Sequence, residues 1–149
     1  YTTYACLVAH YMELAMKCES EGRPELEARA DEVVSRLFLV APDVEMPLNV
    51  NGLECGDRVY NLKEELNIGV SKPADTLVCE YEPLAIHGEG TTFTESWRSL
   101  CEYFDVLYRE YVETDEPLHG SAVMLADQLR SLVESHSPPP ANRDTATVP

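Results

Sequence analysis

The sequence predicts an α+β fold: an N-terminal helical hairpin, a small antiparallel three-stranded sheet covered by a long amphipathic helix, and a C-terminal helix. Three observations lead to this prediction. Apolar residues follow a helical spacing through the N-terminal part of the chain, alternate with polar residues from Val44 onward, and return to a helical spacing after Gly90. With 149 residues, of which 44% are hydrophobic, the chain is long enough to bury a core.

We expect three segments along the chain. Residues 1–42 form the helical hairpin, and residues 43–136 form an α+β domain. Residues 137–149 are rich in proline and nearly lack large apolar side chains, which is typical of a disordered tail.

The hairpin is predicted from two amphipathic segments with a break between them. Gly22 and Pro24 mark the break, because glycine suits a helix C-terminus and proline the first helical turn. The second helix closes at Ala41-Pro42. The two apolar faces comprise Tyr4, Leu7, Val8, Tyr11, Leu14, Ala15 and Cys18, and then Leu26, Ala30, Val33, Val34, Leu37 and Phe38.

A sheet begins where the spacing of apolar residues changes from helical to alternating. Residues 44–50 alternate apolar and polar side chains, and Asn51-Gly52 after them is a strong turn signal. Pro47 cannot donate a hydrogen bond to a neighbouring strand, so we expect either that this strand lies at an edge of the sheet or that the backbone nitrogen of Pro47 faces outward.

The strands that follow are less sharply marked. Residues 57–70 leave two alternatives open, a strand around Val59 or one helical turn at 61–66. Residues 76–82 are rich in β-forming residues and predict a strand, and residues 85–87 pair briefly after it.

The clearest element is a long amphipathic helix at about 93–113. Thr92 and Glu95 have the spacing of a capping box, in which a hydroxyl and a carboxylate satisfy N–H groups at the start of a helix. Gly88 and Gly90 come just before it, and we expect them to allow a positive φ in the strand-to-helix turn. The apolar face of this helix comprises Trp97, Leu100, Cys101, Phe104, Leu107, Tyr108 and Tyr111.

The last predicted helix begins at Ser121, whose hydroxyl suits an N-cap. Its apolar residues keep the helical spacing as far as Val133. We expect it to pack on the sheet or on the preceding helix.

The composition excludes several classes of function. A net charge of −16 with no basic stripe argues against direct nucleic-acid binding and is compatible either with simple solubility or with a basic protein partner. No segment approaches the roughly 20 apolar residues of a membrane span, so we expect no membrane association. The five scattered cysteines indicate reduced thiols rather than a disulfide framework, and hence a cytoplasmic location.

The residues that could carry chemistry form no convincing site. Cys79 and His87 flank a predicted turn and are the best candidates for a nucleophile and its base, but a third, orienting group is absent. No C-x-x-C or H-x-x-x-H pattern indicates a metal. We therefore expect neither an enzyme nor a cofactor.

Residues 82–118 resemble the HicB-like antitoxin family. Members of that family run from a last long strand through a "G-x-T-x-x-E-A"-like turn into an amphipathic helix that ends in acidic residues. The match falls on Leu84, Ile86, Gly88, Gly90, Thr92, Glu95 and Ser96, on the helix face from Trp97 to Tyr111, and on the "ETDEPL" that follows. With the strands before it, the resemblance covers residues 44–118.

The resemblance implies a partial RNase-H-like core that binds and blocks a small basic ribonuclease toxin. This chain departs from the family in two respects: the "PDLPGC"-like segment is only echoed at Glu82-Pro83-Leu84, and the hairpin is extra. We also expect one helix and a polar tail after the core in place of the family's C-terminal DNA-binding module. The acidic residues expected to contact the partner are Glu80, Glu82, Glu89, Asp115 and Glu116.

Two further expectations concern partners. The alternative to an antitoxin-like role is a helical adaptor or chaperone, in which the hairpin binds a partner helix in a groove. An edge strand such as residues 44–50 is also compatible with a symmetric homodimer.

Overall fold

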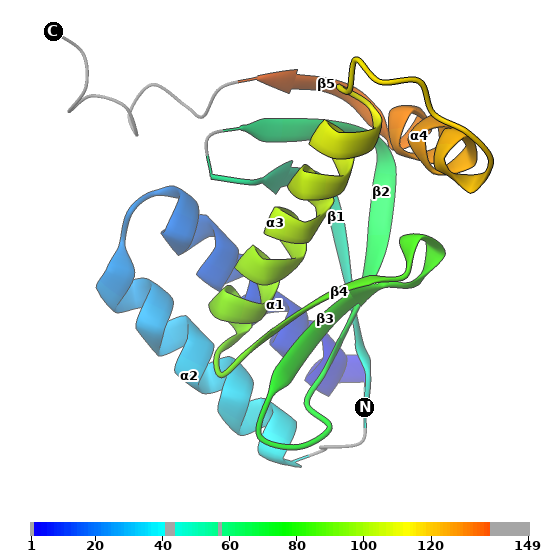
Figure 1. The fold of residues 1–149 in the computed structure, drawn as a ribbon. Coiled ribbons are helices and arrows are strands. Elements are labelled where there is room, and N and C mark those ends of the chain that lie inside the picture. The colour runs from blue at the N-terminus through cyan, green and yellow to red at the C-terminus, as the bar shows by residue number, and fades with distance from the viewer. Residues whose placement is uncertain (1, 41–43, 57, 138–149) are drawn as a thin grey trace, which may run out of the picture.

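The computed structural model describes residues 2–40, 44–56 and 58–137 (Figure 1). The predicted α+β class is confirmed, with the hairpin, the covering helix and the C-terminal helix all present. The predicted tail at 137–149 lies outside the described residues except for Ser137. In chain order the elements are α1 (Thr2–Ser20), α2 (Pro24–Val40), β1 (Met46–Glu54), β2 (Val59–Ser71), β3 (Leu77–Tyr81), the 3-10 turn η1 (Glu82–Leu84), β4 (Ile86–Gly90), α3 (Phe93–Tyr111), α4 (Ser121–Leu132) and β5 (Val133–Ser137).

The sheet has five antiparallel strands instead of the predicted three. Four of them follow the order β1-β2-β3-β4, and β5 pairs with the N-terminal part of β2. The open alternative at 57–70 is settled as a strand, since β2 is continuous from Val59 to Ser71 and a helical turn at 61–66 is wrong. Residues 86–90 form the full strand β4 rather than a brief pairing.

The C-terminal helix is shorter than its apolar spacing predicts. It ends at Leu132, and Val133 adopts an extended conformation with a ψ of 123°. Residues 133–137 then pair with β2, where the Asn61 side-chain amide donates to Ser135 Oγ at 3.1 Å. The helical spacing is wrong here because pairing with a strand far away in sequence outweighs a local pattern.

One face of the sheet carries the core. In β1 the buried residues Met46, Leu48 and Val50 alternate with exposed ones, and β2 and β3 alternate in the same way. The helices α1 and α3 pack on the buried face, and α2 packs on α1 and α3. A single apolar cluster therefore joins the hairpin, the sheet and α3. None of the helices in the described part of the chain combines the length and the apolar character of a bilayer span.

Gly88 and Gly90 let α3 lie directly on β4. A Cβ at Gly88 would overlap two backbone atoms of α3, Leu100 N and Ser96 O, and a Cβ at Gly90 would lie 2.7 Å from Ser96 N. The expected positive φ at these glycines is wrong, because the glycines with positive φ are Gly22, Gly56 and Gly120. The two glycines in β4 are thus needed for close packing and not for a turn.

The start of α3 is capped much as predicted. The Glu95 N–H donates to Thr92 Oγ1 at 3.2 Å, and Thr92 is the N-cap. The Glu95 carboxylate accepts from the side-chain hydroxyl and the N–H of Thr91, one residue before the N-cap of a standard capping box. These bonds to Thr91 hold the pKa of Glu95 below its ordinary value.

Replacing Gly88 by alanine should destabilise the fold by about 2–3 kcal/mol, since the new Cβ collides with helix backbone that cannot move aside. Gly52→Ala is the matched control, because the Cβ there would meet Tyr60 O at an ordinary 3.4 Å. Urea unfolding of both variants measures the difference. Equal losses in the two variants would mean that the α3–β4 contact is not as close as described.

Trp97→Ala should lower the free energy of unfolding by about 3–5 kcal/mol, because the indole is 4% exposed and stacks on Phe93 with ring centroids 6.5 Å apart. Tyr103→Ala on the same helix replaces a residue that is 42% exposed, and it should lower the free energy of unfolding by less than about 1 kcal/mol. Thermal or denaturant unfolding followed by circular dichroism compares the two. A Trp97 loss as small as that of Tyr103 would contradict its place in the core.

Candidate functional site

The sequence-based candidate pair Cys79 and His87 is not formed. Cys79 is fully buried on the core face and lies 3.3 Å from Ser96 Oγ, while His87 is on the opposite, solvent face of the sheet. The register explains the separation, since Cys79 pairs with Gly88 and His87 pairs with Glu80. Burial raises the pKa of the Cys79 thiol to about 12, which opposes formation of the nucleophilic thiolate.

Metal binding and thiol chemistry find little support elsewhere in the described residues. These residues contain no group of three or more His, Cys, Asp or Glu side chains that could hold a metal ion. All five cysteines are free thiols, and only Cys6 is exposed. No described buried polar side-chain atom lacks a hydrogen-bond partner.

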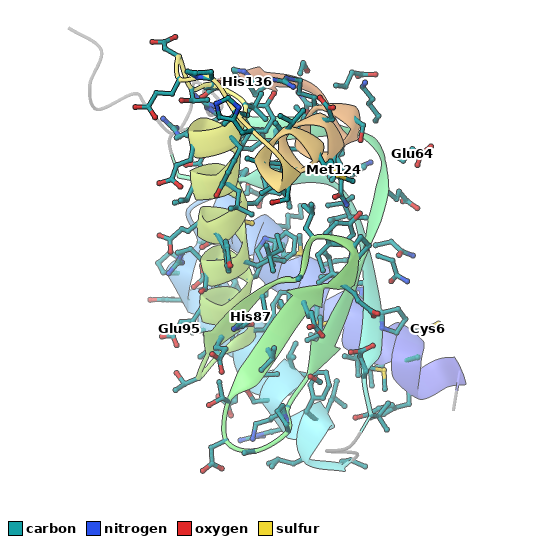
Figure 2. The ribbon with its side chains drawn as sticks, turned by 45° about the vertical axis from the view of Figure 1, so that its right-hand side comes forward. Cys6, Glu64, His87, Glu95, Met124 and His136 are labelled. Atoms are coloured by element: carbon teal, nitrogen blue, oxygen red, sulfur yellow. The ribbon has the colours of Figure 1, made fainter. Side chains whose placement is uncertain are left out.

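The uncovered face of the sheet gathers part of the predicted acidic set. We call this the open face; it consists of the outward-pointing residues of β1 to β4. Glu80 and Glu89 both lie on it, and the imidazole of His87 lies 3.7 Å from the Glu89 carboxylate (Figure 2). The carboxylate of Glu45 lies over Gly69, which is the direct neighbour of Glu80 in the register. Glu45, Glu80 and Glu89 are therefore among the carboxylates that share this face.

The other predicted residues lie elsewhere. Glu82 is in η1, directly after β3. Asp115 and Glu116 follow the C-terminal end of α3, whereas Glu89 precedes its N-terminal end. A helix of 19 residues is roughly 28 Å long, so these two carboxylates are too far from Glu89 to share one contact with it.

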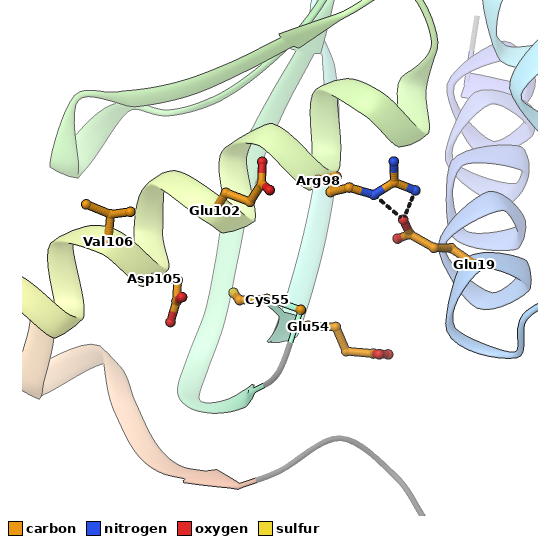
Figure 3. Close-up of a pocket in the computed structure, with 8 residues that line it drawn as sticks. Glu19, Glu54, Cys55, Arg98, Glu102, Asp105 and Val106 are labelled. Atoms are coloured by element: carbon orange, nitrogen blue, oxygen red, sulfur yellow. Dashed lines mark hydrogen bonds and ion pairs between the residues drawn. The ribbon is translucent and has the colours of Figure 1, made fainter. Parts of the chain in front are cut away.

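The structure also contains a concave acidic surface that the sequence did not predict. Two adjoining pockets of about 380 and 300 Å³ lie between α1, β1 and α3, and both are lined by Glu19 and Glu54. Figure 3 shows the first of them. We call them together the acidic groove. Its charged lining is Glu13, Glu19, Glu54, Glu102 and Asp105, with Arg98 as the one cation that lines either of these pockets.

Two of the carboxylates in the groove are held in place. Glu19 of α1 accepts two hydrogen bonds from the guanidinium of Arg98 on α3, and these bonds help to raise the pKa of Arg98. Asp105 accepts from the Tyr60 hydroxyl at 2.6 Å and forms an ion pair of 3.0 Å with Arg109. Burial, and next the bond to Asp105, raise the pKa of Tyr60.

A second polar network closes the far end of α3. Arg58 forms an ion pair of 2.9 Å with Glu113, and the imidazole of His136 lies 3.4 Å from the same carboxylate. The His136 ring also packs on Tyr60 and Tyr108, with centroids 5.9 and 5.8 Å away. Figure 2 shows His136 at this end of the molecule, remote from His87. These contacts link β5 to β2 and to the end of α3.

Asp31 is a buried carboxylate that joins the hairpin to α3. It is 5% exposed, and its Oδ1 accepts from both the N–H and the hydroxyl of Thr94, in the first turn of α3. Burial raises its pKa, the two bonds to Thr94 lower it, and the carboxylates of Glu19 and Glu95 add to the rise. The result is a pKa above the ordinary value.

Comparison with known proteins found no similar protein. The chain matches no family model, no curated protein and no solved structure with which it was compared. The HicB-like resemblance therefore stays a prediction. Its residues form the junction of η1, β4 and α3 in the structure.

Asp31→Asn should leave stability at pH 7 unchanged or higher, because the amide oxygen still accepts from Thr94 and no charge is buried. The raised pKa means that the folded protein holds this proton more tightly than the unfolded chain does. The contribution of Asp31 is therefore most favourable below the unfolded carboxyl pKa and is lost as pH rises through the raised folded pKa.

Unfolding free energies of the wild type and of Asp31→Asn should accordingly converge as the pH falls toward about 4. Asp31→Ala removes the hydrogen-bond acceptor of Thr94 altogether. Its free energy of unfolding should therefore be about 1–3 kcal/mol below that of the wild type, both at pH 7 and at about pH 4. A wild type that gains stability relative to Asp31→Asn as pH rises would contradict a raised pKa for Asp31.

Proposed function

We propose that this chain is a non-catalytic acidic module that binds a basic protein partner, with the acidic groove as the main contact. The supporting observation is the groove itself: five carboxylates and one guanidinium line a concave surface between α1, β1 and α3. A lysine or arginine side chain of a partner would find several acceptors there. Guanidinium-carboxylate pairs of this kind are among the stronger polar contacts, since they are charge-assisted and can be bidentate.

The charge of the whole chain favours the same kind of partner. A formal charge of −16 creates a field that attracts a basic surface over more than contact distance. Such steering raises the association rate and weakens as salt is added. The open face, with Glu80 and Glu89, would extend the attraction beyond the groove.

The resemblance of residues 82–118 suggests which basic partner to expect. HicB-like antitoxins bind small basic ribonuclease toxins, and a toxin of that type is our proposed partner. A cytoplasmic location belongs to the same proposal and is supported by the five free thiols. Catalysis forms no part of it, because the one candidate pair, Cys79 and His87, lies on opposite faces of the sheet.

The adaptor alternative and the homodimer stay predictions. An adaptor of the kind envisaged needs a groove for a partner helix, yet the hairpin uses its inward face in the core through residues such as Met12, Val34 and Phe38. The strand at 44–50 lies at the end of the sheet order, as an edge-to-edge dimer requires.

Three double variants with equal changes in net charge test the proposal. Glu54→Gln with Glu102→Gln alters the groove, and Glu80→Gln with Glu89→Gln alters the open face. Asp115→Asn with Glu116→Gln alters the remote loop. Each tagged variant is used to capture proteins from the native host at salt concentrations from about 50 to about 500 mM. The captured basic protein is then purified, tested for ribonuclease activity and titrated against every variant.

We expect one small basic protein whose capture is lost at high salt. The groove variant should bind it at least about tenfold more weakly, and the loop variant should bind it nearly as the wild type does. Equal losses in all three variants would show that only net charge matters and would contradict the groove as the contact. Absence of any basic partner would contradict the proposed function.

A further inference from the structure

A second, chemically different hollow lies on the hairpin. It has a volume of about 200 Å³ and is formed by α1, α2 and the turn that joins them, two helices that run side by side in Figure 1. We call it the hairpin slot. It is far more apolar than the acidic groove, and its apolar walls are Tyr11, Leu14, Cys18, Leu26, Ala30 and Val33.

The rim of the hairpin slot is positively charged although the chain as a whole is strongly negative. Lys17, Arg23 and Arg29 line it, which is three of the chain's 11 Lys and Arg residues in one small hollow. Glu21 is the single carboxylate among the lining residues, and it lies 3.9 Å from Arg23. Lys17 and Arg29 have no ion-pair partner among the residues that the structure describes. Two cations without an ion pair in the described part of the chain thus line an apolar hollow.

We infer that the hairpin slot binds a small amphiphilic anion, a medium-chain carboxylate, with its alkyl chain between α1 and α2 and its carboxylate between Lys17 and Arg29. The apolar walls offer few hydrogen-bond partners, so a sugar would lose its hydration there, and free phosphate would contact the rim cations but leave the apolar walls uncovered. A volume of about 200 Å³ is below that of pockets for drug-sized ligands and suits a short alkyl chain.

The charge of the rest of the protein decides between a small anion and an acidic protein segment. A small ligand with one negative charge, held next to the rim cations, is repelled by the rest of the chain less than a segment with several negative charges. An acidic segment would extend beyond the rim and meet the surrounding surface of a chain with a charge of −16. The small anion is therefore the occupant that the charges favour. This inference is independent of the acidic groove and of the proposed partner.

Titration calorimetry with decanoate, kept below its micelle concentration, tests the inference on the whole chain. We expect saturable binding of one decanoate per chain. Affinity should rise about fourfold for each methylene from hexanoate to decanoate, until the chain outgrows the slot. Lys17→Glu with Arg29→Glu should weaken binding at least about tenfold.

Arg36→Glu is the matched control, because Arg36 is an exposed cation of α2 that pairs with Glu32 and does not line the slot. It should leave decanoate binding unchanged. Glu21→Gln, which removes the one carboxylate of the rim, should strengthen it. Neutral decanol should bind more weakly than decanoate and should not respond to Lys17→Glu with Arg29→Glu.

Cys18 supplies a readout at the slot itself. Cys18 as a residue is 3% exposed and lines the slot, so bound decanoate should slow alkylation of its thiol by iodoacetamide, as followed by peptide mass spectrometry. Cys6, which is exposed and does not line the slot, should react at an unchanged rate. The inference would be overturned if decanoate did not bind saturably, or if it bound without slowing the alkylation of Cys18. It would also be overturned if Arg36→Glu weakened decanoate binding as much as Lys17→Glu with Arg29→Glu does.

Discussion

The close contact between the backbone of α3 and β4 is the constraint on which the rest of the structure depends. It exists because Gly88 presents no Cβ to Leu100 N and Ser96 O. Once α3 lies on β4, its first turn meets the hairpin, where Asp31 accepts from Thr94 and Arg98 binds Glu19. Helices from both ends of the chain are thereby placed on one side of the sheet.

That one-sided arrangement creates the surfaces available for binding. The core face is closed by α1 and α3, so the opposite face, with Glu80 and Glu89, stays in solvent. The acidic groove forms where α1, β1 and α3 meet without filling the space between them. The hairpin slot lies on α1 and α2 and carries the opposite charge. The fold thus separates a negative groove from a small positive rim.

Local patterns predicted most of the elements but not the surfaces. The alternation at 44–50 and the helical spacing after Thr92 are local properties, and the helix formed where expected. The strand formed as well, but β1 runs from Met46 to Glu54, through the Asn51-Gly52 pair that predicted a turn, with only a register shift between Val50 and Gly52. The strand at 133–137 could not be predicted, because its extended form depends on pairing with Val59 to Leu62. The acidic groove combines residues from Glu13 to Asp105, which only the packing of α1 against β1 and α3 brings together.

Native-state hydrogen exchange tests the central role of the α3–β4 contact most directly. If that contact organises the fold, the amides of α3 between Trp97 and Phe104 and those of β4 exchange only through global unfolding, with the largest opening free energies in the chain. Exchange of these amides through a local opening, at a free energy clearly below that of the amides paired between β1 and β2, would contradict the account.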